Sequence, residues 1–143
     1  MPFSANLMLT QMGVIGGQAI VPMRNPEFLT PEYLSLLARY RVSHVLNSWT
    51  RMPELGTQMS LPGVFTSDFF LVRALLQPGR AYEEAVKRFA PYAQVREANP
   101  AARRTLRELM GYARSSGRRA LIFVNNRLEG NAPGTIEAVI ESE

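Results

Sequence analysis

Four short apolar segments, each followed by a stretch with helical signals, constrain the fold of this chain more than any other feature. The segments lie at residues 18–24, 42–48, 66–75 and 120–124, and they are rich in β-branched or aromatic side chains. Such runs are typical of strands buried in a sheet. Because strands that alternate with helices form parallel sheets with right-handed crossovers, we predict an α/β fold with four parallel strands.

Helix start and stop signals stand at the expected places between these strands. Thr30 precedes Pro31 and Asn99 precedes Pro100, so each pair offers a capping side chain followed by a proline in the first helical turn. Gly117 ends the helix that Asn99 begins, and Pro133 lies in the first turn of a helix after the last strand. A further helix is predicted at about residues 81–89, whereas residues 49–64 read as a long irregular loop.

Length and composition are those of one domain without membrane segments. The chain has 143 residues, 46% of them apolar, and it contains no cysteine, which fits a reducing compartment such as the cytoplasm. No apolar run approaches the ~20 residues of a membrane-spanning helix. Residues 1–17 have an apolar pattern near helical spacing that ends at Gly16-Gly17, so we expect a short helix there, and the absence of a basic start argues against a signal peptide.

Several separated motifs resemble those of one protein family. They are FVNNRLEGNAPGTIEAV at residues 123–139, MRNPEFLTPEYLSLL at 23–37, HVLNSWTRMP at 44–53 and TSDFFLVRALLQPGRAY at 66–82. In this order they resemble the YecE-like family, domain of unknown function 72, over about residues 18–141. Residues 1–17 have no clear counterpart in that resemblance.

The resemblance implies a more specific fold than alternation alone. Members of the family look like eight-stranded (β/α) barrels, and a complete barrel needs roughly 250 residues. This chain is similar only to the later half, so residues 18–143 are expected to form a half-barrel of four parallel strands, each followed by helix. The family has no settled activity, and the resemblance therefore implies a fold rather than a reaction.

Polar residues follow the predicted strands and identify a candidate site. In α/β proteins ligands bind at the carboxyl ends of parallel strands. Two arginines with several amides there would suit a phosphate or carboxylate group, and Trp49 could supply a stacking face. The candidate ligand-binding residues are Arg24, Asn25, Asn47, Trp49, Arg73, Asn125 and Asn126. The alternatives are that Asn125 and Asn126 only cap the strand in an Asx turn, and that Trp49 only packs over the sheet.

No catalytic group stands out in the sequence. Glu129 is a weak candidate for a general acid or base, with surface solvation as the alternative, and the only histidine, His44, lies early in its strand as a core residue would. There is no Gly-x-Gly-x-x-Gly or P-loop motif and no cluster of metal ligands, so we expect neither a cofactor nor a metal.

An arginine-rich segment suggests a second function. Seven arginines lie between residues 96 and 119, and among them Arg103, Arg104, Arg107 and Arg114 belong to the predicted helix. Arg103, Arg107 and Arg114 fall near one face and could follow a nucleic-acid backbone, although charged helix faces are usually only solvated. A third possibility is a shortened relative that binds nothing.

A half-barrel is expected to need a partner. Two edge strands would have unpaired backbone groups, and the inward face of the sheet, with residues such as Phe69, Leu71, Leu121 and Phe123, would meet water. We therefore expect a homodimer, or a partner chain that completes the barrel, unless residues 1–17 cover the open face.

Overall fold

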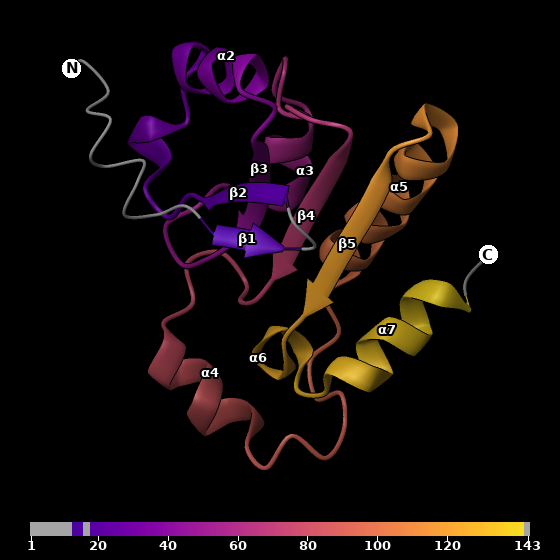
Figure 1. The fold of residues 1–143 in the computed structure, drawn as a ribbon. Helices are drawn as coiled ribbons and strands as arrows, with labels where there is room; N and C mark the ends of the chain where they lie inside the picture. The colour runs from indigo at the N-terminus through magenta and orange to yellow at the C-terminus, as the bar shows by residue number, and fades with distance from the viewer. Residues whose placement is uncertain (1–12, 16–17, 142–143) are drawn as a thin grey trace.

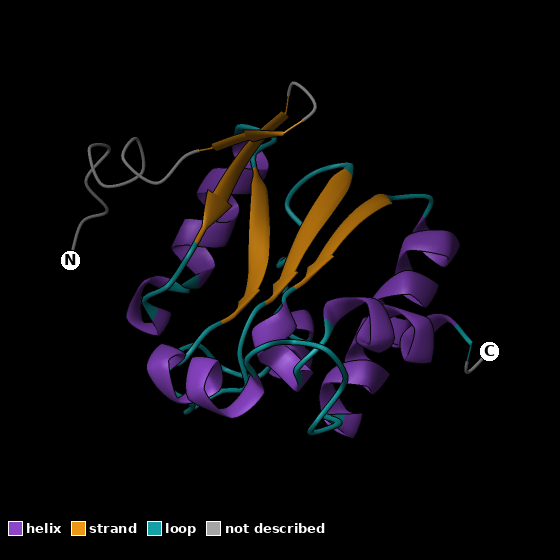
Figure 2. Ribbon diagram, turned by 90° about the horizontal axis from the view of Figure 1, so that it is seen from below, coloured by secondary structure: helices purple, strands orange, loops and turns teal. Residues whose placement is uncertain are grey.

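The computed structural model describes residues 13–15 and 18–141, which form one curved sheet with helices along its outer side (Figures 1 and 2). The sheet has five strands in the order β1-β2-β3-β4-β5. The strands are β1 (Gly13–Ile15), β2 (Gln18–Pro22), β3 (Ser43–Ser48), β4 (Phe69–Ala74) and β5 (Arg119–Val124). The helices are η1 (Pro26–Phe28), α2 (Pro31–Arg39), α3 (Leu55–Met59), α4 (Tyr82–Phe89), α5 (Pro100–Ser116), α6 (Asn126–Glu129) and α7 (Ala132–Ile140).

The predicted set of four parallel strands is confirmed. β2 pairs with β3, β3 with β4 and β4 with β5, in each case in parallel. Each of these four parallel strands is followed by helix. The sheet is open, with β1 and β5 as its edge strands among the described residues, so the fold is the expected half-barrel rather than a closed barrel.

The N-terminal segment differs from the helix expected over residues 1–17. Gly13–Ile15 form β1, which pairs antiparallel with β2, and Ile15 lies opposite Gln18. Residues 1–12 and 16–17 lie outside the described residues, so the rest of this expectation is not addressed. The sequence does hold a hairpin signal, because Val14 and Ile15 are β-branched and only Gly16-Gly17 separate the two paired strands.

The helix signals between the strands correspond to real caps. The side chain of Thr30 accepts a hydrogen bond from the backbone N–H of Tyr33, and that of Asn99 accepts one from Ala102. Gly117 has φ 68°, a left-handed conformation that ends α5. The prediction of an irregular loop over residues 49–64 was wrong in part, because Leu55–Met59 form the short helix α3 within it.

The two faces of the sheet pack differently. Outward side chains of β3, β4 and β5 join α3, α5 and α7 in the largest apolar cluster, which contains Leu46, Phe70, Val72, Leu106 and Leu109. On the inner face Ile20, Val45, Phe69 and Leu71 form a smaller buried cluster. Phe123 on the same face is 51% exposed. The inner face is therefore covered over β2–β4 and open beside β5.

Candidate anion site at the carboxyl ends of the strands

Arg24 and Arg73 form a pair of like charges at the carboxyl ends of β2 and β4. Arg73 is half-buried on the inner face, and Arg24 is exposed two residues after the end of β2. Burial lowers the pKa of Arg73, and the positive charge of Arg24 lowers it further. Within residues 13–15 and 18–141, neither guanidinium makes a hydrogen bond or an ion pair.

The ring of Trp49 contacts the guanidinium of Arg24. The guanidinium carbon of Arg24 lies 4.9 Å from the centre of the Trp49 ring, which is a cation–π contact. Trp49 itself is partly buried and packs against the clusters around α2 and α4. The indole therefore packs over the end of the sheet, which is the alternative considered from the sequence, and it also contacts Arg24; stacking against a ligand stays a prediction.

Asn47 is held rigidly beside the pair. It lies directly opposite Arg73 in the register of β3 and β4. It has no exposed surface, its Nδ2 donates to the carbonyl of Met23 at 3.1 Å, and its Oδ1 has no hydrogen-bond partner in the described part of the chain. Because Met23 directly precedes Arg24, this bond ties the end of β3 to the segment that carries the exposed cation.

Gln58 on α3 is a site-positioning residue that the sequence analysis missed. Its Oε1 accepts from the backbone N–H of Asn47 at 3.1 Å, while its Nε2 donates to the Asn47 carbonyl at 3.0 Å and the Pro53 carbonyl at 2.7 Å. The buried Gln58 side chain thus makes the hydrogen bonds to the backbone N–H and C=O of Asn47 that a neighbouring strand would otherwise make. The sequence contains only a weak signal for this role. Gln58 lies three residues after the apolar Leu55, so the two side chains would share one side of a short helix.

A mainly apolar groove of about 280 Å³ leads along the inner face to Arg73. It is lined by Ile20, Pro22, Leu71, Arg73 and Phe123. A molecule in this groove would have apolar surface along most of its length and a guanidinium at the end near the strand termini. The groove therefore suits a ligand with an apolar or ring-shaped body and an anionic group.

The paired asparagines after β5 differ in their contacts: Asn125 forms the Asx turn considered as the alternative, whereas Asn126 bonds to the start of α7. The Asn125 side chain accepts from the N–H and the guanidinium of Arg127, at 2.9 and 3.2 Å. Asn126 Oδ1 accepts from the N–H of Ala132 at 2.7 Å, so it orders the start of α7. Asn25 is exposed and precedes η1 without a side-chain capping bond. Of the seven candidates, Arg24, Asn47, Trp49 and Arg73 are thus linked by contact, charge or register.

Glu129 holds together three segments and has no exposed surface. Its carboxylate accepts from Arg103 Nη2 at 2.8 Å, from the Asn99 N–H at 2.6 Å and from the Thr135 hydroxyl at 2.7 Å. These donors enclose the carboxylate and tie α5, α6 and α7 together. The structure therefore gives Glu129 a structural role, and its burial contradicts the surface solvation considered as the alternative, while the acid-base role stays a prediction.

The arginine stripe on α5 is largely used inside the protein. Arg103 is paired with Glu129, and Arg107 donates to the carbonyls of Ala138 and Val139 at the end of α7. Such contacts satisfy helix-terminal carbonyls that would otherwise lack partners. Arg104 and Arg114 are exposed. Arg103 and Arg107, which belong to the stripe considered for nucleic acid, thus bind neighbouring segments of the same chain.

No group of three or more histidine, aspartate or glutamate side chains in the described part of the chain could hold a metal ion. No helix among the same residues is long and apolar enough to span a membrane.

Comparison with known protein families identifies the family of this chain. Residues 8–142 match the family described as "Protein of unknown function DUF72", so the match includes part of the N-terminal segment. No curated protein and no solved structure matched the chain. Since the family match covers nearly the whole sequence, the chain belongs to the DUF72 family.

Proposed function

We propose that this protein binds a small anionic ligand, bearing a phosphate or carboxylate group, between Arg24 and Arg73. The observation that carries the proposal is the juxtaposition of these two cations without a recorded acidic partner in the described residues. Burial lowers the pKa of Arg73, and the positive charge of Arg24 lowers it further, so the two guanidiniums repel each other. An anion between them would remove the repulsion and use donors that suit planar oxygen groups.

The surroundings favour a ligand that has more than the anionic group. Trp49 stands beneath Arg24, and the groove of Ile20, Leu71 and Phe123 ends at Arg73. Aromatic and apolar walls with a few polar groups at one end are characteristic of small-molecule sites. We therefore propose a phosphorylated or carboxylated small molecule rather than a free inorganic ion as the natural ligand.

Nucleic-acid binding is the weaker candidate. It relied on Arg103, Arg104, Arg107 and Arg114 as a phosphate-binding stripe, and the side chains of Arg103 and Arg107 bind other segments of the chain. Fewer arginines are then available for phosphate contacts, so binding would be weak at physiological salt.

Trp49 makes the proposal directly testable. It is the only tryptophan in the chain, and it contacts Arg24, so its fluorescence should change when an anion reorients that side chain. Titration with inorganic phosphate at low ionic strength should give a saturable signal in the wild-type protein. Arg73→Met should weaken phosphate binding by tenfold or more, because a hydrogen bond to a charged group contributes about 1.5–3 kcal/mol.

Arg104→Met is the matched control, since Arg104 is exposed on α5 and has no recorded contact with the pair. It should leave the titration unchanged. Equal phosphate affinity in the wild type and the Arg73→Met variant would refute the proposed site. Loss of phosphate binding in Arg104→Met with retention in Arg73→Met would instead favour the helix α5 stripe.

A further inference from the structure

A second cavity lies at the carboxyl ends of β3 and β4, on the helix-covered side of the sheet. It has a volume of about 230 Å³ and lies between α3, α5 and the loop that follows β4. Ser48, the last residue of β3, and Gln77, in the loop after β4, belong to its lining. Arg24 and Arg73 do not line it, so it is separate from the proposed anion site. In α/β proteins ligands bind at this end of the sheet.

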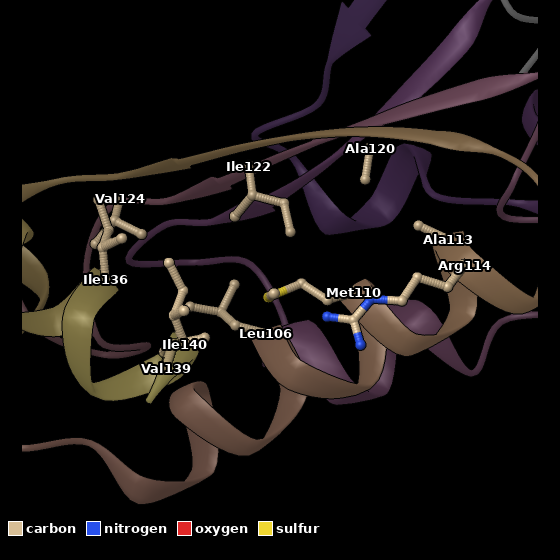
Figure 3. Close-up of a pocket in the computed structure, with 10 residues that line it drawn as sticks. All are labelled: Leu106, Met110, Ala113, Arg114, Ala120, Ile122, Val124, Ile136, Val139 and Ile140. Carbon is tan, nitrogen blue, oxygen red and sulfur yellow. The ribbon is translucent and has the colours of Figure 1, made fainter. Parts of the chain in front are cut away.

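The lining of this cavity differs chemically from that of another groove along α5. That groove, of about 400 Å³, lies between β5, α5 and α7, and Figure 3 shows apolar side chains around it with Arg114 as the charged one among the labelled residues. The cavity at the strand ends instead contains a carboxylate, two amides and two hydroxyls, which belong to Glu54, Gln77, Asn99, Ser48 and Thr105. Such a mixture of hydrogen-bond donors and acceptors suits a polar ligand.

Thr105 on α5 supplies a buried hydroxyl that faces the cavity. Its side chain is 9% exposed, and the hydroxyl forms no hydrogen bond within the described ranges 13–15 and 18–141. The hydroxyl points toward Gly56 of α3, because a Cβ added to Gly56 would lie 3.2 Å from Thr105 Oγ1. A buried hydroxyl without a partner costs free energy, so this group favours a ligand that hydrogen-bonds to it. Because Gly56 has no side chain, the space in front of the hydroxyl stays open.

The charges around the cavity favour a neutral ligand. Glu54 lines the cavity, and its carboxylate makes no ion pair in the described part of the chain. At the start of α5, the backbone N–H of Asn99 already donates to the Glu129 carboxylate at 2.6 Å. These two carboxylates repel an anion that the helix N-terminus would otherwise attract. A single carboxylate in the lining also provides too few charged ligands for a metal ion.

We propose that this cavity binds one neutral ring that carries several hydroxyl groups, which is a sugar or a cyclitol. Ring hydroxyls donate to the Glu54 carboxylate and accept from the amide nitrogens of Gln77 and Asn99. The Asn99 nitrogen is available for this contact because Oδ1 of the same side chain caps α5. The Thr105 hydroxyl donates to one ring oxygen and accepts from another hydroxyl. A volume of about 230 Å³ is smaller than the roughly 300–1,000 Å³ of sites for drug-sized ligands, so the cavity suits a single ring.

Titration of the isotope-labelled full chain, followed by the NMR shifts of its backbone amides, tests this proposal. The compounds are D-glucose, D-ribose and myo-inositol, and at least one should cause saturable shifts at Gly56 and Ala102 at millimolar concentration. Gly56→Ala should weaken this binding by tenfold or more, because the added methyl group occupies the space in front of the Thr105 hydroxyl. Gly56 lies within α3, where alanine favours the helix, so this variant should keep its fold. Gly111→Ala is the matched control and should bind as the wild type does, because its added Cβ meets nothing within 4 Å.

Two substitutions of Thr105 separate its hydrogen bond from its shape. Thr105→Val keeps the shape without the hydroxyl and should weaken binding by about fivefold, whereas Thr105→Ser keeps the hydroxyl and should restore most of the affinity. Arg73→Met should leave the titration unchanged, so the outcome does not depend on the anion site. Several results would overturn the proposal: no saturable shift with any of the three compounds, equal affinity in the wild type and Gly56→Ala, or equal affinity for cyclohexanol and myo-inositol. Inorganic phosphate that shifts the same amides in place of the ring compounds would also contradict a neutral ligand.

Discussion

His44 should make the stability of this protein depend on pH in a range where few other groups titrate. The ring is buried behind β3, its Nδ1 is 3.0 Å from the hydroxyl of Tyr33, and its Nε2 has no hydrogen-bond partner in the described part of the chain. Burial lowers the pKa of His44 to about 4, compared with 6.5 in an exposed peptide. The folded protein therefore keeps this ring neutral at a pH where the unfolded chain protonates it.

The sign and size of the effect follow from this difference in pKa. Between pH 6.5 and about 4 the unfolded state binds more protons than the folded state, so stability is complete above this window and falls as the pH is lowered through it. A difference of roughly 2.5 pH units at 1.36 kcal/mol per unit corresponds to a loss of about 3 kcal/mol. About 2 kcal/mol of this loss should occur between about pH 6.5 and 5, which lies above the ordinary pKa values of carboxylates.

Urea denaturation at a series of pH values measures this loss. The chain contains one histidine, so a slope in this interval can be assigned to His44. His44→Gln retains a polar group that can meet Tyr33 and cannot titrate; it should lower stability at neutral pH and abolish the slope above pH ~5. A wild-type free energy of unfolding that is constant over this interval, or an equal slope in His44→Gln, would refute the reasoning.

Three further predictions concern individual residues of the fold. In buffer without multivalent anions, Arg73→Met should leave the thermal midpoint unchanged or raise it, because it removes a half-buried charge that repels Arg24; a clear decrease would show that the guanidinium has an unrecognised partner. Glu129→Gln should cost about 2–4 kcal/mol in urea denaturation, because it leaves Arg103 without its carboxylate, and a loss below 1 kcal/mol would contradict the structural role assigned here. Gly130→Ala should cost about 2–3 kcal/mol, because Gly130 has φ 114° and an added Cβ would lie 2.8 Å from the Gln94 carbonyl oxygen. Gly111→Ala on α5, where an added Cβ meets nothing within 4 Å, is its matched control and should stabilise the protein by about 0.5–1 kcal/mol.

The elements that the sequence predicted well depend on local chemistry. Four apolar runs became parallel strands, and Thr30, Asn99 and Gly117 capped or ended helices as their side chains or φ angles dictate. The sequence also contains a signal for β1, since Gly16-Gly17 directly follows the β-branched pair Val14-Ile15, but the preceding apolar residues have near-helical spacing and favoured a helix prediction.

The parts that could not be predicted depend on partners distant in sequence. Glu129 looked like a loop residue, and only the packing of α5 brings Arg103 and Asn99 against it. The capping of α7 by Arg107 similarly joins residues 32 positions apart, so the charge pattern of α5 alone could not separate solvated arginines from paired ones. Arg24 and Arg73 were predicted as site residues because the ends of strands can be recognised in the sequence. The hydrogen bonds between Gln58 and the backbone of Asn47 could not be predicted, because they depend on how the loop after β3 folds back.

The most direct test of the anion site is a crystal of the wild-type protein soaked in tungstate, a phosphate-shaped anion that can be located by its anomalous scattering. The structure predicts a peak within hydrogen-bond distance of both the Arg24 and Arg73 guanidiniums, near Trp49 and at the end of the inner groove. No such peak should occur in crystals of Arg73→Met. A map with tungstate bound elsewhere and none between Arg24 and Arg73, or with a carboxylate of the protein occupying that position, would contradict the account.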